Sequence, residues 1–256
     1  MTLARPLPER ALRPLVRLAA MLALCALALQ LVFVARIAAM ALIDPQSTTF
    51  QRSEAWRRLV DKHRLDWHQR WVDDKRIATS LKRAVIASED AAFVEHHGVD
   101  WDALGKAWDR NQRAQAQSGG AAAPAARPAP GREPKLVGGS TISQQLAKNL
   151  LLSGERNLPR KAQEFVLTLA LEGLLSKRRM LEIYLNSVEW GEGVFGAEAA
   201  AQHYFRTPAA GLSTMQAARL AVMLPAPKRF EKRPGSAYVV GRAGTVAARM
   251  ADVDLP

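Results

Sequence analysis

The sequence predicts a mainly α-helical domain preceded by one N-terminal transmembrane helix. Residues 18–35 carry no formal charge. As a helix rising 1.5 Å per residue they would extend about 27 Å, close to the roughly 30 Å hydrocarbon core of a bilayer. Further along, apolar residues recur at helical spacing in residues 77–92, 159–176 and 211–224. A chain of 256 residues can bury the sizeable core of one medium domain.

The charge balance is strongly basic, with 36 Lys and Arg against 24 Asp and Glu, a formal net charge of +12. Such a balance suits an anionic partner, which could be nucleic acid, anionic lipid or a phosphorylated substrate. Cys25 is the single cysteine and lies inside the apolar run, so an internal disulfide is excluded. The sequence contains no Cys/His cluster with zinc spacing and no P-loop.

The N-terminal tail of residues 1–17 contains Arg5, Arg10, Arg13 and Arg17. Positive charge before a membrane span predicts a cytoplasmic N-terminus, with the remainder of the chain outside. We extend the anchor over residues 18–43, with Arg36 snorkelling to the interface. A cleaved signal peptide ending at Ala39-Met40-Ala41 is the alternative, but the long apolar run and Arg36 favour an uncleaved anchor. A buried core helix is disfavoured because the run is apolar on all sides.

Residues 44–76 are polar and include Trp56, Trp67 and Trp71. Tryptophan favours the membrane interface, which would make this juxtamembrane segment a stalk. Helices packed on the domain explain the composition equally well.

Residues 77–92 are predicted to form a helix that ends beside a carboxylate. Ile77, Leu81, Ala84 and Val85 follow one helical stripe, and Glu89 lies on its flank. Partial desolvation there would raise the pKa of Glu89 and make it a better base near neutral pH. The alternative role is a helix-end glutamate paired with a lysine.

The stretch Gly138 to Asn149, GGSTISQQLAKN, predicts a capped helix with one polar face. Its glycines allow backbone to approach a ligand closely, and Ser140 or Thr141 can cap the helix that follows. Thr141, Gln145 and Lys148 share one face, while Ile142 and Leu146 turn inward. A well-capped surface helix is the simpler alternative.

Between these helices, residues 111–136 are rich in Ala, Pro, Gly and Gln and predict a flexible insertion. Pro159 starts the next helix, which is expected to run to about residue 176. In it Glu164 shares a face with Leu167, Leu171 and Leu175. A carboxylate on an apolar face needs either a partner, such as Arg160 or Lys161, or a function.

Five stretches in order resemble the motifs of the peptidoglycan glycosyltransferases of family 51, which polymerise lipid II. The first is Glu89-Asp90-x-x-Phe93-x-x-His96-x-Gly98-x-Asp100, the second is GGSTISQQLAKN, and the third is Arg160-Lys161-x-x-Glu164. The fourth is Lys177-x-x-x-x-Glu182-x-Tyr184-Leu185-Asn186, and the fifth runs over residues 189–200. The resemblance places the glycosyltransferase domain in residues 77–256. No SxxK, SxN and KTG boxes follow, so a single-domain member without a transpeptidase is expected.

The resemblance implies a lysozyme-like helical fold and an inverting sugar transfer. The acceptor 4-hydroxyl attacks the anomeric carbon of the donor, and undecaprenyl pyrophosphate leaves. Glu89 is then the expected base, and Glu164 orients or stabilises the donor. Lys148, Arg160 and Lys161 would clamp the pyrophosphate. The other expected substrate-binding residues are Asp90, Ser140, Thr141, Gln145 and Asn149.

The same resemblance sets the expected partners and location. Lipid II, the growing glycan strand and membrane lipid are the expected partners, together with other cell-wall synthesis or division proteins, and nucleic acid is not. The expected location is the bacterial inner membrane, with a periplasmic catalytic domain. We expect no tightly bound cofactor and no dedicated metal site, and leave Mg²⁺ or Mn²⁺ open as an aid to the leaving group. A lysozyme-like lytic enzyme and a non-enzymatic membrane-tethered scaffold or nucleic-acid binder are the competing hypotheses.

Overall fold

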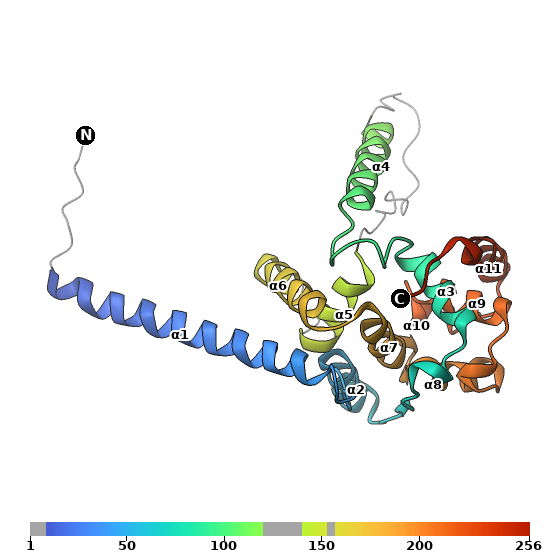
Figure 1. The fold of residues 1–256 in the computed structure, drawn as a ribbon, viewed down its shortest axis with the longest axis horizontal. Helices are drawn as coiled ribbons and strands as arrows, with labels where there is room; N and C mark the ends of the chain where they lie inside the picture. Colours follow the sequence, from blue (N-terminus) through green and yellow to red (C-terminus); the bar gives the residue numbers. More distant parts are fainter. Residues whose placement is uncertain (1–8, 120–139, 153–156) are drawn as a thin grey trace.

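The structure is a computed structural model that describes residues 9–119, 140–152 and 157–256. Helices dominate it (Figure 1). They are α1 Glu9–Ala39, α2 Thr49–Lys62, α3 Thr79–Glu89, α4 Trp101–Gly119, α5 Ile142–Leu151, α6 Leu158–Leu174, α7 Lys177–Ser187, α8 Ala197–Phe205, α9 Thr214–Met223, α10 Pro227–Phe230 and α11 Ala237–Arg249. The strands are β1 His68–Gln69, β2 Glu189–Gly191 and β3 Val194–Phe195, and the 3-10 turns are η1 Asp74–Arg76, η2 Ala209–Gly211 and η3 Met250–Asp252. The predicted mainly α-helical class is confirmed.

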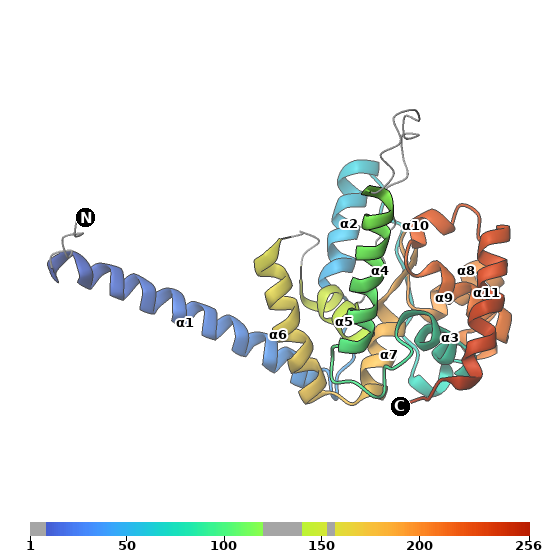
Figure 2. The same cartoon turned by 90° about the horizontal axis from the view of Figure 1, so that it is seen from above.

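Helix α1 projects away from the body of the protein in both views (Figures 1 and 2). Its part from Arg13 to Ala39 is long and apolar enough to cross a membrane. The bounds differ from the predicted anchor of residues 18–43, since the helix begins at Glu9 and ends at Ala39. Residues 9–17 of the basic tail join the helix because backbone hydrogen bonds continue regardless of side-chain charge, and arginine is a good helix former.

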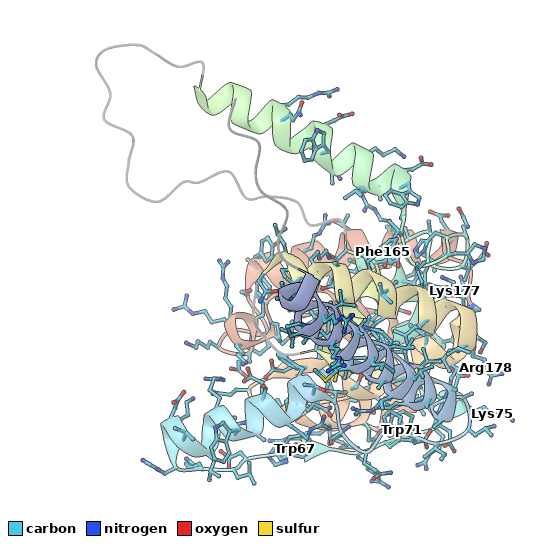
Figure 3. The ribbon with its side chains drawn as sticks, turned by 90° about the vertical axis from the view of Figure 1, so that its left-hand side faces the viewer. Trp67, Trp71, Lys75, Phe165, Lys177 and Arg178 are labelled. Carbon is cyan, nitrogen blue, oxygen red and sulfur yellow. The ribbon has the colours of Figure 1, made fainter. Side chains whose placement is uncertain are left out.

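The C-terminal end of α1 is packed against the domain. Ile37 is fully buried and Met40 is 4% exposed. Nearer the middle of α1, the side-chain amide of Gln30 exchanges hydrogen bonds of 2.8 and 3.0 Å with that of Gln163, which lies on α6. Figure 3 looks at the domain from this side, where Phe165 lies on α6 and Lys75, Lys177 and Arg178 lie along one edge. The anchor is therefore fixed to the domain at its base.

Residues 44–76 pack on the domain, which decides between the two alternatives for this segment. Helix α2 contacts α5, and the side-chain amide of Gln51 donates to the carbonyl oxygen of Ser187 at 3.0 Å. Val72 belongs to the core with 3% exposure. Strand β1 then pairs in parallel with β3. A free stalk is excluded for these residues.

A small three-stranded sheet, which the helical patterns did not predict, accompanies the helices. Its order is β1-β3-β2, with β2 antiparallel to β3. Gly196 follows β3 and has a φ of +82°. A Cβ atom added to this residue would lie 2.6 Å from the carbonyl oxygen of Asn186. Glycine is required there because other residues both avoid this φ and would collide. The glycine-rich fifth stretch thus turns the chain from β3 into α8.

Helices α3, α9 and α11 pack on one another and form one part of the core, to which α5, α6, α7 and α8 also contribute. Helix α11 was not predicted, although Val239, Ala243 and Val246 recur at helical spacing and are 0%, 0% and 2% exposed. Ser236 caps its start by accepting a hydrogen bond from the Val239 amide.

The predicted flexible insertion needs one correction. Residues 111–119 continue α4 as a helix. Alanine, glutamine and arginine favour helix even where they bury no core, so composition alone did not fix the end of this element. The rest of the predicted insertion, residues 120–136, lies outside the described residues.

Candidate active site

Glu89 occupies the last position of α3 and is partly buried. Burial raises the pKa of the Glu89 carboxyl, and the nearby charge of Asp90 raises it further. A hydrogen bond from Gln145 and the charge of Lys148 act in the opposite direction without cancelling this rise. The shift predicted from the apolar stripe is therefore present, and its main cause is desolvation.

The side chain of Gln145 is held between Glu89 and Tyr184. Its Nε2 donates to Glu89 Oε2 at 3.0 Å, and its Oε1 accepts from the Tyr184 hydroxyl at 2.9 Å. Burial and the charges of Glu89 and Asp90 raise the pKa of Tyr184 well above its ordinary value, so it stays a donor. This arrangement fixes which end of the amide faces the carboxylate. Sequence patterns placed Gln145 toward substrate and did not show this role.

Asp90 joins the first motif to the second. Its Oδ1 lies 2.9 Å from Nε2 of His96, and its Oδ2 accepts the backbone amide of Ile142 at 2.9 Å. The residue is 7% exposed. Oδ2 therefore holds the start of α5 against the end of α3, and Oδ1 binds His96. Asp90 also lines the cavity beside Glu89, so its predicted contact with substrate stays a prediction.

Thr141, rather than Ser140, caps α5. Its hydroxyl accepts from the amide of Gln144 and donates to the carbonyl oxygen of Gly98 at 2.6 Å. Gly98 has φ +89°, and a Cβ there would lie 2.8 Å from Thr168 Cγ2. Thr141 is 3% exposed, and its hydroxyl is fully engaged. It therefore positions the second motif. Thr141 also lines the cavity beside Glu89, so its predicted contact with substrate stays a prediction.

The Glu89 cavity, as we name it, has a volume of about 370 Å³ between the end of α3 and α4. Its polar lining consists of Ser88, Glu89, Asp90, Asp100, Lys106, Arg110, Ser140 and Thr141. Asp100 accepts the amide of Ala103 at 2.7 Å and so caps the start of α4. Lys106 and Arg110 were not predicted. The two residues are four positions apart and follow the first motif. This spacing could have indicated them as site residues, because it places both on one helix face.

A second, neighbouring cavity of about 460 Å³ lies between α5 and α6, and we name it the Glu164 cavity. Glu164 is 4% exposed. Its Oε2 is 3.0 Å from Arg160 Nη1, and its Oε1 is 2.5 Å from Lys161 Nζ. The predicted apolar face is present, with Leu167 and Leu171 buried beneath it. Glu164 thus has the two cationic partners that the sequence suggested.

The two cavities share Ser140 in their linings. Lys148 lines the Glu164 cavity with Arg160 and Lys161, so the structure brings the three predicted clamp residues together. Asn149 is half-buried on the same helix and is not among the residues that line this cavity. Gly138 and Gly139, which open the second motif, lie outside the described residues.

Residues of the fourth motif make contacts that join the helices around the site. Lys177 Nζ pairs with Glu172 at 2.8 Å and lies 4.6 Å from the centre of the Phe93 ring. Glu172 also accepts the hydroxyl of Ser143 at 2.6 Å. Asn186 accepts the amide of Val72 and donates to its carbonyl oxygen, both at 2.9 Å. These contacts give the fourth motif a scaffolding role and tie α5, α6 and α7 together.

Comparison with known proteins identifies the family to which this chain belongs. The family model described as Transglycosylase matches residues 57–123 and 128–251, which is most of the chain. The chain belongs to the transglycosylase family. The match is interrupted at residues 124–127, inside the predicted insertion. The lysozyme-like helical fold expected from the motifs is the fold of this family.

Curated relatives resemble the chain over most of its length. A biosynthetic peptidoglycan transglycosylase of Burkholderia thailandensis is 50% identical over 230 residues, covering 90% of this chain and 83% of the relative. One from Paraburkholderia phytofirmans is 46% identical over 254 residues, covering 99% and 97%. A third, from Paraburkholderia xenovorans, is 46% identical over 240 residues, covering 93% and 92%. The likeness therefore extends over most of this chain and most of each of the three relatives.

Proposed function

We propose that the protein is a peptidoglycan glycosyltransferase of cell-wall synthesis that polymerises lipid II into β-1,4 glycan strands. The transferase class follows from the family and from the names of its relatives. In the reaction, the acceptor 4-hydroxyl oxygen bonds to the anomeric carbon as the bond from that carbon to the pyrophosphate oxygen breaks. The configuration inverts, the hydroxyl proton is taken by a base, and undecaprenyl pyrophosphate leaves.

Glu89 is the proposed base, and its environment is the observation that carries the proposal. Desolvation raises its pKa, and the carboxylate has no cation within ion-pair distance among the described residues. A base works best when its pKa lies near the working pH, so this shift favours proton transfer from a sugar hydroxyl. Gln145 holds one carboxylate oxygen and leaves the other for the acceptor.

The Glu164 cavity is the proposed site of the pyrophosphate. Lys148, Arg160 and Lys161 bring positive charge to one side of it, where charge develops as the leaving group departs. Glu164 would keep Arg160 and Lys161 in place, which makes it a positioning group for the donor. Ser140 lies in the linings of both cavities and is proposed to contact the sugar or phosphate between them. Asn149 stays a predicted contact.

A lytic enzyme with a related fold would use water as acceptor. It has no need of three cations beside the second carboxylate, and the names of the relatives favour synthesis. A bound metal is not part of the proposal. Among the described residues, no three His, Cys, Asp or Glu side chains come together as metal ligands. The use of Mg²⁺ or Mn²⁺ with the pyrophosphate stays a prediction, which rates measured with and without a chelator would test.

Incubation of the purified protein with labelled lipid II tests the proposed function. The expected products are glycan chains, resolved by size, together with undecaprenyl pyrophosphate. Purified glycan strands should stay intact in a parallel reaction. Shortening of those strands without chain growth would favour the lytic enzyme, and absence of both would favour the scaffold.

The anchor is proposed to span the inner membrane once, with the N-terminus in the cytoplasm. Arg10, Arg13 and Arg17 precede the apolar part of α1, and positive charge is retained on the cytoplasmic side. A reporter that is active only outside the cytoplasm should be active when fused after Pro256. An inactive fusion would reverse the proposed orientation. Membrane lipid and other cell-wall or division proteins are further proposed partners.

A further inference from the structure

A pocket of about 290 Å³ lies at the base of the anchor, outside both cavities of the active site. Its lining comes from the end of α1, the connection to α2, and the first turn of α2. Arg36, Ile43, Asp44, Ser47 and Arg52 are among its residues. The polymerase reaction uses none of these side chains.

The pocket lies at a definite height relative to the proposed membrane span. Arg17 and Arg36 bracket a stretch of α1 with no charged residue. They are about 28 Å apart along the helix axis at 1.5 Å per residue, which nearly equals the hydrocarbon thickness of a bilayer. If Arg17 lies among the cytoplasmic headgroups, Arg36 lies among the headgroups of the opposite leaflet. This step rests on the proposed membrane anchoring.

The pocket carries positive charge that the described protein does not neutralise. Arg36 and Arg52 are close enough to repel each other. Neither takes part in an ion pair within the described ranges. Asp44 is the acidic residue in the lining, and its Oδ1 is already 2.7 Å from Arg179 Nη2. Arg179 also donates to the carbonyl oxygen of Met40 at 2.8 Å, which fixes the loop.

Arg52 is held in place by neutral groups. Its Nη1 donates to the carbonyl oxygen and to Oγ of Ser47 at 3.2 and 3.0 Å, and its Nη2 donates to Thr49 Oγ1 at 3.2 Å. The first turn of α2 contains no acidic residue, so the positive end of this helix dipole adds to the two guanidinium groups. A preformed site for an anion results.

We propose that this pocket binds the phosphate group of an anionic phospholipid in the outer leaflet of the membrane. Two guanidinium groups match the charge and geometry of phosphate oxygens, and the Ser47 hydroxyl lies beside them. Leu42 and Ile43 are 92% and 65% exposed next to the pocket. Apolar side chains at this position suit the acyl chains of a lipid, whereas a free phosphate ion would gain nothing from them.

The bound headgroup would set the height of the domain over the membrane. Met40 and Ile37 connect the pocket to the core, and α1 packs on α6, which carries the Glu164 cavity. A lipid at the base of α1 therefore fixes the level at which that cavity faces a lipid-linked donor.

The test measures lipid binding to the full-length protein in neutral detergent by native mass spectrometry. Phosphatidylglycerol and phosphatidylcholine are added at equal concentration to the wild-type chain, to Arg36→Gln, to Arg52→Gln and to the double variant. Arg242→Gln is the matched control, since Arg242 is exposed on α11 and far along the chain from the anchor. Melting temperatures in the same detergent establish that each variant is folded.

Wild-type and control proteins should retain phosphatidylglycerol in preference to phosphatidylcholine, and each single variant should bind it about 10-fold more weakly. Equal retention of the two lipids, or wild-type retention by the double variant, would overturn the proposal. Displacement of the lipid by millimolar inorganic phosphate would also overturn it, in favour of a free-anion site. Arg52→Lys, which keeps the charge, serves where the glutamine variants do not fold and should retain the preference. The binding readout needs no polymerisation, so its failure is distinct from failure of the proposed function.

Discussion

Glu89 and Glu164 are both glutamates beside a cavity, the first partly buried and the second buried, yet their surroundings differ in kind. Glu89 is held by the neutral amide of Gln145, and burial raises its pKa. Glu164 is bound directly by Arg160 and Lys161. Desolvation without a paired cation raises the pKa of a carboxyl group and makes it a stronger base. A desolvated carboxylate that is paired with cations instead holds those cations in fixed positions. The same residue type can therefore supply a base in one cavity and hold a cationic clamp in the next.

Replacing the proposed base should give the largest loss. Glu89→Gln keeps the shape and removes the basicity, so polymerisation of lipid II should fall by about 10²-fold or more. The control is Glu189→Gln, because Glu189 is also buried, with 6% exposure, but lies on β2 outside both cavities. Initial rates and melting temperatures of both variants are the measurement. Near-normal turnover by folded Glu89→Gln would remove Glu89 as the base.

The clamp should give the next largest effect. Lys148→Ala removes an exposed cation from the Glu164 cavity, and loss of a charge-assisted contact of roughly 1.5–3 kcal/mol should cost about 10- to 100-fold in rate. Its melting temperature should stay close to that of the wild type. Arg160→Ala should lose activity similarly but should also melt lower, since Glu164 then keeps Lys161 alone.

A double variant separates the two roles of Arg160. In Arg160→Ala/Glu164→Gln the buried carboxylate is absent, so stability should recover in part while activity stays low. Restored activity in the double variant would show that the arginine serves to neutralise Glu164 and contributes nothing to the leaving group. Full activity of Lys148→Ala and Arg160→Ala would remove the argument against a lytic enzyme.

The sequence predicted much of this contrast because both carboxylates follow local patterns. The apolar stripe before Glu89 predicted its desolvation, and Leu167 and Leu171 predicted the buried face of Glu164. Helical spacing alone also supplied Arg160 and Lys161 as partners. Such relationships arise within one helix and so can be read from spacing.

Contacts between helices were the part that spacing could not supply. Tyr184 reaches Gln145, and Asp90 reaches the amide of Ile142, only because α7, α5 and the end of α3 meet in space. The hydrogen bond from the Thr141 hydroxyl to the carbonyl oxygen of Gly98 could not be predicted for the same reason. The short strands were missed because β1 and β3 are two residues each, too short to show a period of their own.

Tyr184→Phe tests whether Gln145 tunes the base, with a smaller expected effect. Without the hydroxyl, the amide can turn away, and Glu89 loses the hydrogen bond that lowers its pKa. The acid limb of the kcat/KM profile should then move to higher pH, so that the loss of rate is greatest on the acid side and disappears as the pH rises. Tyr204→Phe, whose hydroxyl donates to the carbonyl oxygen of Trp190, is the control. A uniform loss at every pH would indicate a packing defect instead.

Glu189 provides the comparison outside the active site and should change stability without changing the reaction. Burial, partly offset by Lys228, raises its pKa from 4.5 to about 7, and the nearby charges of Glu54 and Glu231 add to the rise. Its Oε1 makes no hydrogen bond and lies 3.6 Å from Lys228 Nζ. The same desolvation acts here as at Glu89, but Glu189 lines neither the Glu89 cavity nor the Glu164 cavity.

The sign of the effect follows from proton binding. Between pH 4.5 and about 7 the folded protein keeps a proton on Glu189 that the unfolded chain has lost, so stability falls as pH rises through this window. Glu189→Gln should flatten that dependence, by about 3 kcal/mol at most, and should unfold at higher temperature than the wild type near pH 8. Thermal unfolding at several pH values in one detergent measures it. Parallel pH profiles for the two proteins would mean that Glu189 titrates as an ordinary carboxylate, and that burial alone is too weak in this fold to prepare Glu89 as a base.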